Sequence, residues 1–207
     1  MAEEPAGLIR LKKADIGPAT EVLARAFERD PKMEYFTSDT GDHRALTRQI
    51  LRFELAYGIL YGEVYAPSPA MEGVAVWLPS KKAEISFWRA VRAGALSLRR
   101  HVGGDVMKRI LAFSEYIDAL HREHLPDAHW YLFFIGVDPD HQGKGIASRL
   151  IRPMLARFDR EGVSCYLVTQ NEQNVPLYEH YGFGVISRST IPGCDVGHVE
   201  MLRKAGQ

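Results

Sequence analysis

The feature that most constrains the fold is an unbroken apolar run at residues 130–137, which reads WYLFFIGV. A strand with one wet face alternates polar and apolar residues, whereas a continuous run of this length is typical of a strand covered on both faces. An acidic turn at residues 138–140 ends the run, and apolar residues at helical spacing follow in 142–159. This order predicts a mixed α/β protein with helices on both faces of one sheet.

The remaining segments supply elements that fit such a sheet. Strands are expected at residues 8–12, 63–66, 71–78, 130–137, 165–169, 183–189 and 197–202, the last two as a hairpin. Helices are expected at 16–28 after the N-cap candidate Asp15, at 42–61 after Asp42, at 142–159 and at 175–181, with an irregular or short helical stretch at 29–40. We therefore predict a mixed, mostly antiparallel sheet of about seven strands flanked by helices.

A long segment, residues 79–128, carries no strand signal. It contains two helical stripes, Ile85, Trp88, Val91, Ala95 and Leu98, and Val106, Ile110, Phe113, Ile117 and Leu120. Gly103 and Gly104 separate the two stripes. The segment is expected to be a helical pair inserted between the third and fourth strands.

Length, charge and cysteine content exclude several classes of protein. The 207 residues suit one domain, 1–207, that contains this insertion. Lys plus Arg and Asp plus Glu number 26 each, so no long-range field attracts nucleic acid or an anionic membrane. The start, MAEEPAG, lacks the apolar region of a signal peptide, and no apolar run approaches the ~20 residues of a membrane helix. Two cysteines make no disulfide scaffold, so a cytoplasmic protein is expected.

The turn before the 142–159 helix has the chemistry of a phosphate site. Gly143 and Gly145 bracket Lys144 where the helix begins, and Ala147 keeps the first turn open. Free N–H groups and the positive end of the helix dipole bind phosphate there, and glycines let it approach the backbone. The spacing differs from a Walker loop, and Ser148 stands where a dinucleotide fingerprint has its third glycine. The pyrophosphate of coenzyme A is the remaining interpretation.

Two segments resemble the GNAT superfamily of N-acetyltransferases. Residues 142–147, QGKGIA, match its acyl-CoA signature Q/R-x-x-G-x-G/A. Asn171 stands seven residues before Tyr178, and residues 177–183, LYEHYGF, resemble the segment N-x-x-A-x-x-L-Y-x-x-x-G-F, with Asn174 where alanine is common. The resemblance covers the C-terminal half closely and the N-terminal half in element order. Residues 73–77, the insertion and residues 136–145 look like the puromycin N-acetyltransferase branch.

The resemblance implies an acetyl-CoA-dependent N-acetyltransferase with its acyl-CoA-binding core at about 130–183. Ile135, Gly136 and Val137 would pair their backbone with the pantetheine arm, in a gap between the strands that carry Ile135 and Val168. The Val137 N–H would donate to the thioester carbonyl. The pyrophosphate would be held by Gln142, Gly143, Lys144, Gly145, Ile146, Ala147 and Ser148.

Two further roles follow from the same resemblance. Asn171 would hydrogen-bond the pantetheine arm, and Tyr178 would protonate the leaving thiolate as general acid. Alternatives from the residues themselves stay open. Asn171 can cap the following helix, Tyr178 can be a packed aromatic, and Lys144 can be solvated while the backbone binds phosphate.

The general base is not identified by the sequence. The strand at 165–169 offers no carboxylate, although many family members carry a Glu there. Glu34, Asp30 and Glu54 are candidates, as are a water chain and capture of the neutral amine. The pair His121 and His124 is interpreted as surface with no metal site, and Cys165 as core packing.

The insertion suggests the class of acceptor. Its aromatics Trp88, Phe113 and Tyr116 would wall one side of a cleft, opposite residues 33–36 and Trp77. Such a cleft suits a compact amine better than an extended peptide, which needs an open groove. We expect a small-molecule primary amine as acceptor. The protein itself is expected to be a monomer or a homodimer. The alternatives are a protein N-terminal or lysine acetyltransferase, and a CoA-binding module without turnover.

Overall fold

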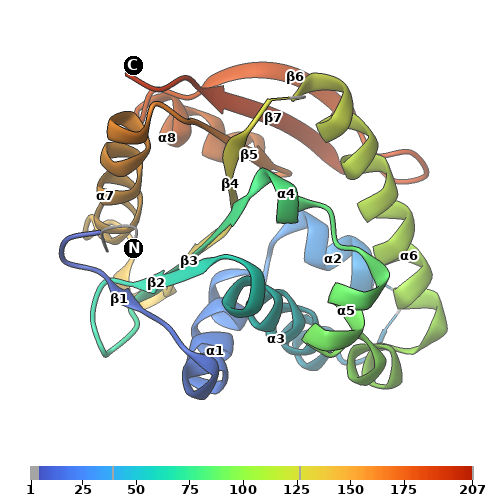
Figure 1. The fold of residues 1–207 in the computed structure, drawn as a ribbon. Helices are drawn as coiled ribbons and strands as arrows, with labels where there is room; N and C mark the ends of the chain where they lie inside the picture. Colours follow the sequence, from blue (N-terminus) through green and yellow to red (C-terminus); the bar gives the residue numbers. More distant parts are fainter. Residues whose placement is uncertain (1–4, 39, 126, 207) are drawn as a thin grey trace.

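The protein is described by a computed structural model over residues 5–38, 40–125 and 127–206. Its centre is a seven-stranded sheet in the order β1-β2-β3-β4-β5-β7-β6, in which only β4 and β5 pair in parallel (Figure 1). The strands are β1 Ile9–Arg10, β2 Glu63–Ala66, β3 Gly73–Pro79, β4 His129–Val137, β5 Ser164–Thr169, β6 Gly184–Thr190 and β7 Gly197–Arg203. The expected mixed, mostly antiparallel sheet is confirmed.

Helices cover both faces of this sheet (Figure 1). One face carries α1 Ile16–Ala26, α2 Pro31–Thr37, α3 His43–Tyr61, α4 Ser80–Ala83, α5 Phe87–Ala93 and α6 Ala95–His124. The other carries α7 Ile146–Glu161 and α8 Val175–Glu179, and 3₁₀ turns stand at η1 Lys13–Asp15, η2 Pro139–His141 and η3 Glu172–Asn174. The insertion between β3 and β4 is therefore helical, as expected. Within the described residues every helix is too short or too polar to span a bilayer.

The parallel strands β4 and β5 separate half-way along their length. Their paired positions run from His129 and Ser164 to Leu132 and Leu167 and then stop. Beyond this point β4 continues to Val137 beside β3 only, while β5 continues to Thr169 beside β7. The expected gap between the strands that carry Ile135 and Val168 is therefore present, and it exposes one backbone edge of β4.

A β-bulge stands at this point of separation. Val76 pairs with Phe134 and Trp77 pairs with Leu132, so Phe133 has no partner on β3. An extra residue shifts the alternation of side chains by one position. Phe133 and Phe134 consequently both pack on the face covered by α1 and α6, while Leu132 and Ile135 pack on the α7 face.

One predicted cap and one predicted helix start are wrong. α1 begins at Ile16 as expected, with Asp15 at the N-cap position, but the Asp15 side chain does not cap the helix and instead accepts a hydrogen bond from the Lys12 N–H (2.7 Å) at η1. The helix predicted from residue 142 begins only at Ile146, because the preceding turn contains left-handed glycines. Asp42, in contrast, caps α3 as expected by accepting from the Ala45 N–H at 3.1 Å.

The first stripe of the insertion is also interrupted. Gly94 adopts a left-handed φ of 107° and ends α5 at Ala93, so the stripe from Ile85 to Leu98 belongs to two helices. Trp88 is 78% exposed as a result. The predicted break near Gly103 is confirmed, because this residue leaves helical geometry within α6 (φ 79°, ψ 178°).

Candidate active site

The glycine turn before α7 has the backbone geometry of a ligand loop. Gly143 and Gly145 have φ of 72° and 76°, a region that favours glycine. A Cβ added at either glycine would meet no atom within 4 Å, so both face open space. The first turn of α7 leaves its N–H groups without partners inside the helix, and the helix dipole is positive there. The turn therefore presents donors and partial positive charge to an open surface.

Side chains of the turn hold the turn itself together. The Lys144 ammonium donates to the Asp140 carbonyl at 2.7 Å, and the Gln142 amide donates to the Val137 carbonyl at 3.2 Å. Ser148 accepts from Arg152 at 2.8 Å, and the Ile146 side chain is buried against the sheet. The backbone N–H groups are thus the part of this segment that is free to face a ligand.

The three predicted residues of β4 lie along its exposed edge. Gly136 is packed tightly, since a Cβ there would come within 2.8 Å of both Leu23 of α1 and Phe27, the residue directly after α1. Directly after Val137, Asp138 is buried and pairs with Arg25, and its N–H donates to the Glu72 carbonyl at 2.9 Å. These contacts fix where β4 ends and where the glycine turn begins.

Tyr178 of α8 is 7% exposed and lines the cavity described below. Burial raises the pKa of its phenol, and the nearby Asp30 carboxylate adds to the rise. Among the described residues its hydroxyl has no hydrogen-bond partner. At neutral pH it is therefore a protonated group with a donor to spare. The other residue of this motif, Asn171, caps η3 by accepting from the Gln173 N–H at 3.0 Å, which matches the capping interpretation.

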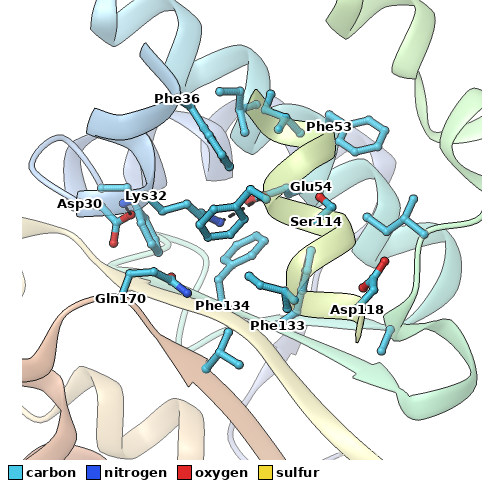
Figure 2. A pocket seen from close by; sticks show the side chains of 18 of the residues that line it. Asp30, Lys32, Phe36, Phe53, Glu54, Ser114, Asp118, Phe133, Phe134 and Gln170 are labelled. Atoms are coloured by element: carbon cyan, nitrogen blue, oxygen red, sulfur yellow. Dashed lines mark hydrogen bonds and ion pairs between the residues drawn. The ribbon is translucent and has the colours of Figure 1, made fainter. Parts of the chain in front are cut away.

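A cavity of about 240 Å³ opens onto the gap between β4 and β5. Its walls come from α2, α3, α5, α6 and the two strands, and aromatic rings fill much of its surface (Figure 2). The aromatic lining residues include Phe36, Phe53, Phe113, Phe133, Phe134 and Tyr178. The insertion therefore walls the cavity as expected.

Several predicted wall residues are not in the lining. Trp77 alternates onto the opposite face of β3, where it contacts Phe158 of α7 edge-on at 5.6 Å. Trp88 points to solvent, and Tyr116 packs into the core beside the cavity. In the 33–36 segment, Phe36 lines the cavity, while Met33 is fully buried beneath it. Phe36 contacts Phe113 edge-on at 5.1 Å, so the two predicted walls do meet.

Four charged side chains line the cavity, Asp30, Lys32, Glu54 and Asp118. Lys32 and Glu54 form an ion pair of 3.1 Å with both side chains largely buried, and the second carboxylate oxygen of Glu54 is buried without a partner. Asp30 caps α2 by accepting from the Lys32 N–H (3.0 Å), and burial raises the pKa of its carboxyl. Glu34 is exposed and outside the lining, so this base candidate is wrong.

The sequence reasoning missed two charged lining residues, Lys32 and Asp118 of α6. Burial, helped by the Glu84 carboxylate, raises the pKa of Asp118 to about 6 against the opposing effect of Arg122. Asp118 has no hydrogen bond or ion pair among the described residues. Its position one residue after Ile117 of the apolar stripe, and four after the lining residue Ser114, is a helical spacing that could have revealed it.

The histidines of the insertion contact the sheet rather than solvent. His121 is buried, and its Nε2 lies 2.7 Å from Nε2 of His129, while His124 Nδ1 lies 2.8 Å from the Glu200 carboxylate. The expected surface pair is wrong for His121, because the end of α6 packs against the start of β4. In the described ranges no group of three or more metal-ligating side chains occurs. Cys165 is fully buried, as expected for core packing.

Comparison with known families decides the class. A model of the acetyltransferase (GNAT) family matches residues 80–183, half of the chain. The chain belongs to the GNAT family of acetyltransferases. The match spans the insertion, β4, the glycine turn, β5 and α8, and the cavity walls from α2 and α3 lie outside it.

Two similar proteins are also named acetyltransferases, and both are longer than this chain. An uncharacterized N-acetyltransferase of Schizosaccharomyces pombe is 27% identical over 84% of this chain and 72% of its own. Mycothiol acetyltransferase of Brachybacterium faecium is 25% identical over 69% of this chain, which spans only 50% of that protein. The chain spans less than a third of two other, longer relatives. Among solved structures, a protein of Corynebacterium glutamicum described as histone acetyltransferase HPA2 and related acetyltransferase has a TM-score of 0.69, with 18% identity and coverage of 97% and 96%.

Proposed function

We propose that this GNAT protein transfers an acetyl group from acetyl-CoA to the primary amine of a small molecule held in the cavity between the insertion and the sheet. The observation that carries the proposal is the position of this cavity. It is lined by β4 and β5 beyond their last paired residues, Leu132 and Leu167, and by Tyr178. A cofactor in the gap would therefore meet an acceptor in the cavity.

The glycine turn and the edge of β4 are the proposed acetyl-CoA site. The pyrophosphate would lie on the N–H groups of residues 143–148, and Lys144 and Gln142 would act by holding the turn. The pantetheine arm would pair with the free edge of β4 at Ile135, Gly136 and Val137, which no strand covers on that side. The Val137 N–H would stabilise negative charge on the thioester oxygen.

Direct transfer needs one proton donor and one acceptor. As the amine nitrogen bonds to the acetyl carbon, the carbon–sulfur bond breaks and the thiolate takes a proton, which Tyr178 would supply. The amine loses a proton, and Asp30 is the carboxylate best placed to take it, because it lines the cavity and acts electrostatically on Tyr178. Its raised pKa favours this role, since a base works best when its pKa nears the working pH. Proximity of the two bound substrates supplies the remaining acceleration.

A peptide acceptor is the competing proposal. An extended peptide binds through its backbone and needs an open groove, whereas this cavity is lined by residues of α6 and by aromatic rings (Figure 2). These features favour a compact amine. The resemblance to the puromycin N-acetyltransferase branch rests on the helical insertion and the 136–145 segment, and we propose it for the architecture only.

The test is an acetylation panel with the released CoA thiol as readout. Small aromatic and aliphatic amines compete with lysine-bearing and N-terminal peptides at equal acetyl-CoA, and Tyr178→Phe serves as the impaired control. Turnover of small amines with higher kcat/KM than any peptide is the expected result. Preferred peptides would instead establish a protein acetyltransferase, and acetyl-CoA binding with no thiol release from any amine would establish a binding module.

A further inference from the structure

The cavity has an unbalanced set of charges. Three carboxylates and one ammonium line it, which leaves a net of two negative charges when all are ionised. The positive charge of Lys32 is neutralised by its ion pair with Glu54. Arg122, the cation that acts on Asp118 from outside the lining, is itself paired with Glu84 at 3.1 Å. Asp30 accepts hydrogen bonds from the Lys32 and Met33 N–H groups, but among the described residues neither Asp30 nor Asp118 has an ion pair. A negative charge without a counter-ion in an apolar cavity is costly, and a cationic ligand would offset this cost.

The two unbalanced carboxylates stand at opposite ends of the cavity. Figure 2 shows Asp30 and Asp118 on opposite sides of the rings of Phe133 and Phe134. Asp30 acts electrostatically on Tyr178, at the proposed reacting end. Asp118 acts instead on Tyr131, which lies where β4 and β5 are still paired. The reacting centre is therefore near Asp30, and Asp118 is beyond the aromatic middle.

α6 carries both an aromatic wall residue and Asp118. Phe113 contacts Phe36 edge-on, and Asp118 is five residues further along the helix, an axial rise of about 7.5 Å at 1.5 Å per residue. A ligand that reaches from Asp30 to Asp118 must pass these rings with an apolar segment. Glu54 offers it one further hydrogen-bond acceptor, the buried carboxylate oxygen without a partner.

We propose that the acceptor of this enzyme is a diamine, with one amine acetylated near Asp30 and the second, still protonated, bound by Asp118. The inference rests on the proposed function and goes beyond it by giving Asp118 the role of a specificity-determining residue. The reaction stays the same at the first amine: a nitrogen–carbon bond forms, the carbon–sulfur bond breaks, and the thiolate is protonated. The second ammonium is unchanged, so the product is a monoacetylated monocation.

The experiment compares probes that differ only in the second amine. Unbranched α,ω-diaminoalkanes of four to ten carbons are tested against n-alkylamines of the same lengths, and 1,4-bis(aminomethyl)benzene against 4-methylbenzylamine, with CoA release as readout. The wild type should prefer the best diamine by at least about tenfold in kcat/KM. Asp118→Asn should reduce this preference to less than about threefold, because kcat/KM should fall more for the diamine than for the monoamine of the same length, and Asp118→Glu should restore part of it.

A matched control lies on the same helix. Glu115 of α6 is exposed and outside the cavity, so Glu115→Gln removes one negative charge without touching the ligand. This variant should keep the full diamine preference. An equal loss of diamine preference in Glu115→Gln and Asp118→Asn would overturn the inference, because the effect would then come from the overall charge of the protein.

Failure of this inference is separable from failure of the proposed function. If monoamines are acetylated as well as diamines, the inference is overturned and small-amine acetylation stands. If no amine is acetylated, the proposed function fails, and calorimetric titration of the CoA-bound protein with the same probes decides the inference. Diamine binding that weakens about tenfold in Asp118→Asn supports it, and absence of diamine binding overturns it.

Discussion

Alanine at Gly145 tests the phosphate site with a control on the same helix. Gly145 and Gly162 flank the two ends of α7 with φ of 76° and 68°, and a Cβ at either position would meet no atom within 4 Å. Alanine therefore imposes the same left-handed backbone strain at both, about 1–2 kcal/mol. Since 1 kcal/mol shifts the melting temperature of a chain of this size by ~2–4 °C, both variants should melt about 2–8 °C lower.

Only one of the two variants should lose cofactor affinity. The sixteen residues of α7 place Gly162 about 24 Å from the turn, whereas a Cβ at Gly145 would enter the open space in which we propose that the phosphate lies. We expect Gly145→Ala to bind CoA more than tenfold weaker than Gly162→Ala, at least ~1.4 kcal/mol. Calorimetric titration with CoA and thermal melting of both variants provide the measurements. Equal CoA affinity in two equally folded variants would refute the phosphate assignment.

Three further predictions follow from the site and its surroundings. Tyr178→Phe should lower kcat by ~10²-fold with little change in KM for acetyl-CoA, and a kcat within twofold under chemistry-limited turnover would leave Tyr178 as packing only. Gly136→Ala should destabilise the protein by about 1–3 kcal/mol in urea unfolding, because its Cβ would collide with Leu23 of α1 and with Phe27, and an unchanged midpoint would contradict that packing. Burial raises the pKa of Asp118 from 3.8 to about 6, so the folded state disfavours the ionised form and loses stability as pH rises through this window. Asp118→Asn should thus exceed the wild type by ~1 kcal/mol at pH 8 after discounting for solvent screening, with the gain shrinking toward pH 4, and a gain independent of pH would contradict it.

Features that depend on local backbone geometry were readable from the sequence. The turn at Gly143 and Gly145 was predicted from its glycines, although the helix start was placed four residues too early because both glycines adopt positive φ. The apolar run of β4 predicted a strand buried on both faces, and the sheet order bears it out. Asp15 shows the limit of this approach, since an acidic residue before a helix can equally close the 3₁₀ turn that precedes it.

The face of a strand or helix on which a given side chain lies could not be predicted from the sequence. Trp77 and its neighbour Val76 lie on opposite faces of β3, so a tryptophan assigned to the cavity is instead buried under α7. The bulge at Phe133 has no sequence signature within a run of apolar residues, yet it puts two adjacent phenylalanines into one wall. Trp88 was expected in the cavity wall but is exposed, because the left-handed Gly94 ends α5 and interrupts the first apolar stripe of the insertion.

Of the four charged lining residues, the sequence reasoning named Asp30 and Glu54 as base candidates and missed Lys32 and Asp118. Lys32 and Glu54 are 22 residues apart, and Asp118 joins them from a third helix, so no motif spacing connects them. Their arrangement has a physical consequence for the enzyme. β5 carries no carboxylate, and Asp30, just before α2, is the carboxylate that acts electrostatically on Tyr178, which is why we propose it as the base. A desolvated acid at each end of an apolar cavity lowers the stability of the empty protein, and a ligand with two cationic ends would recover it.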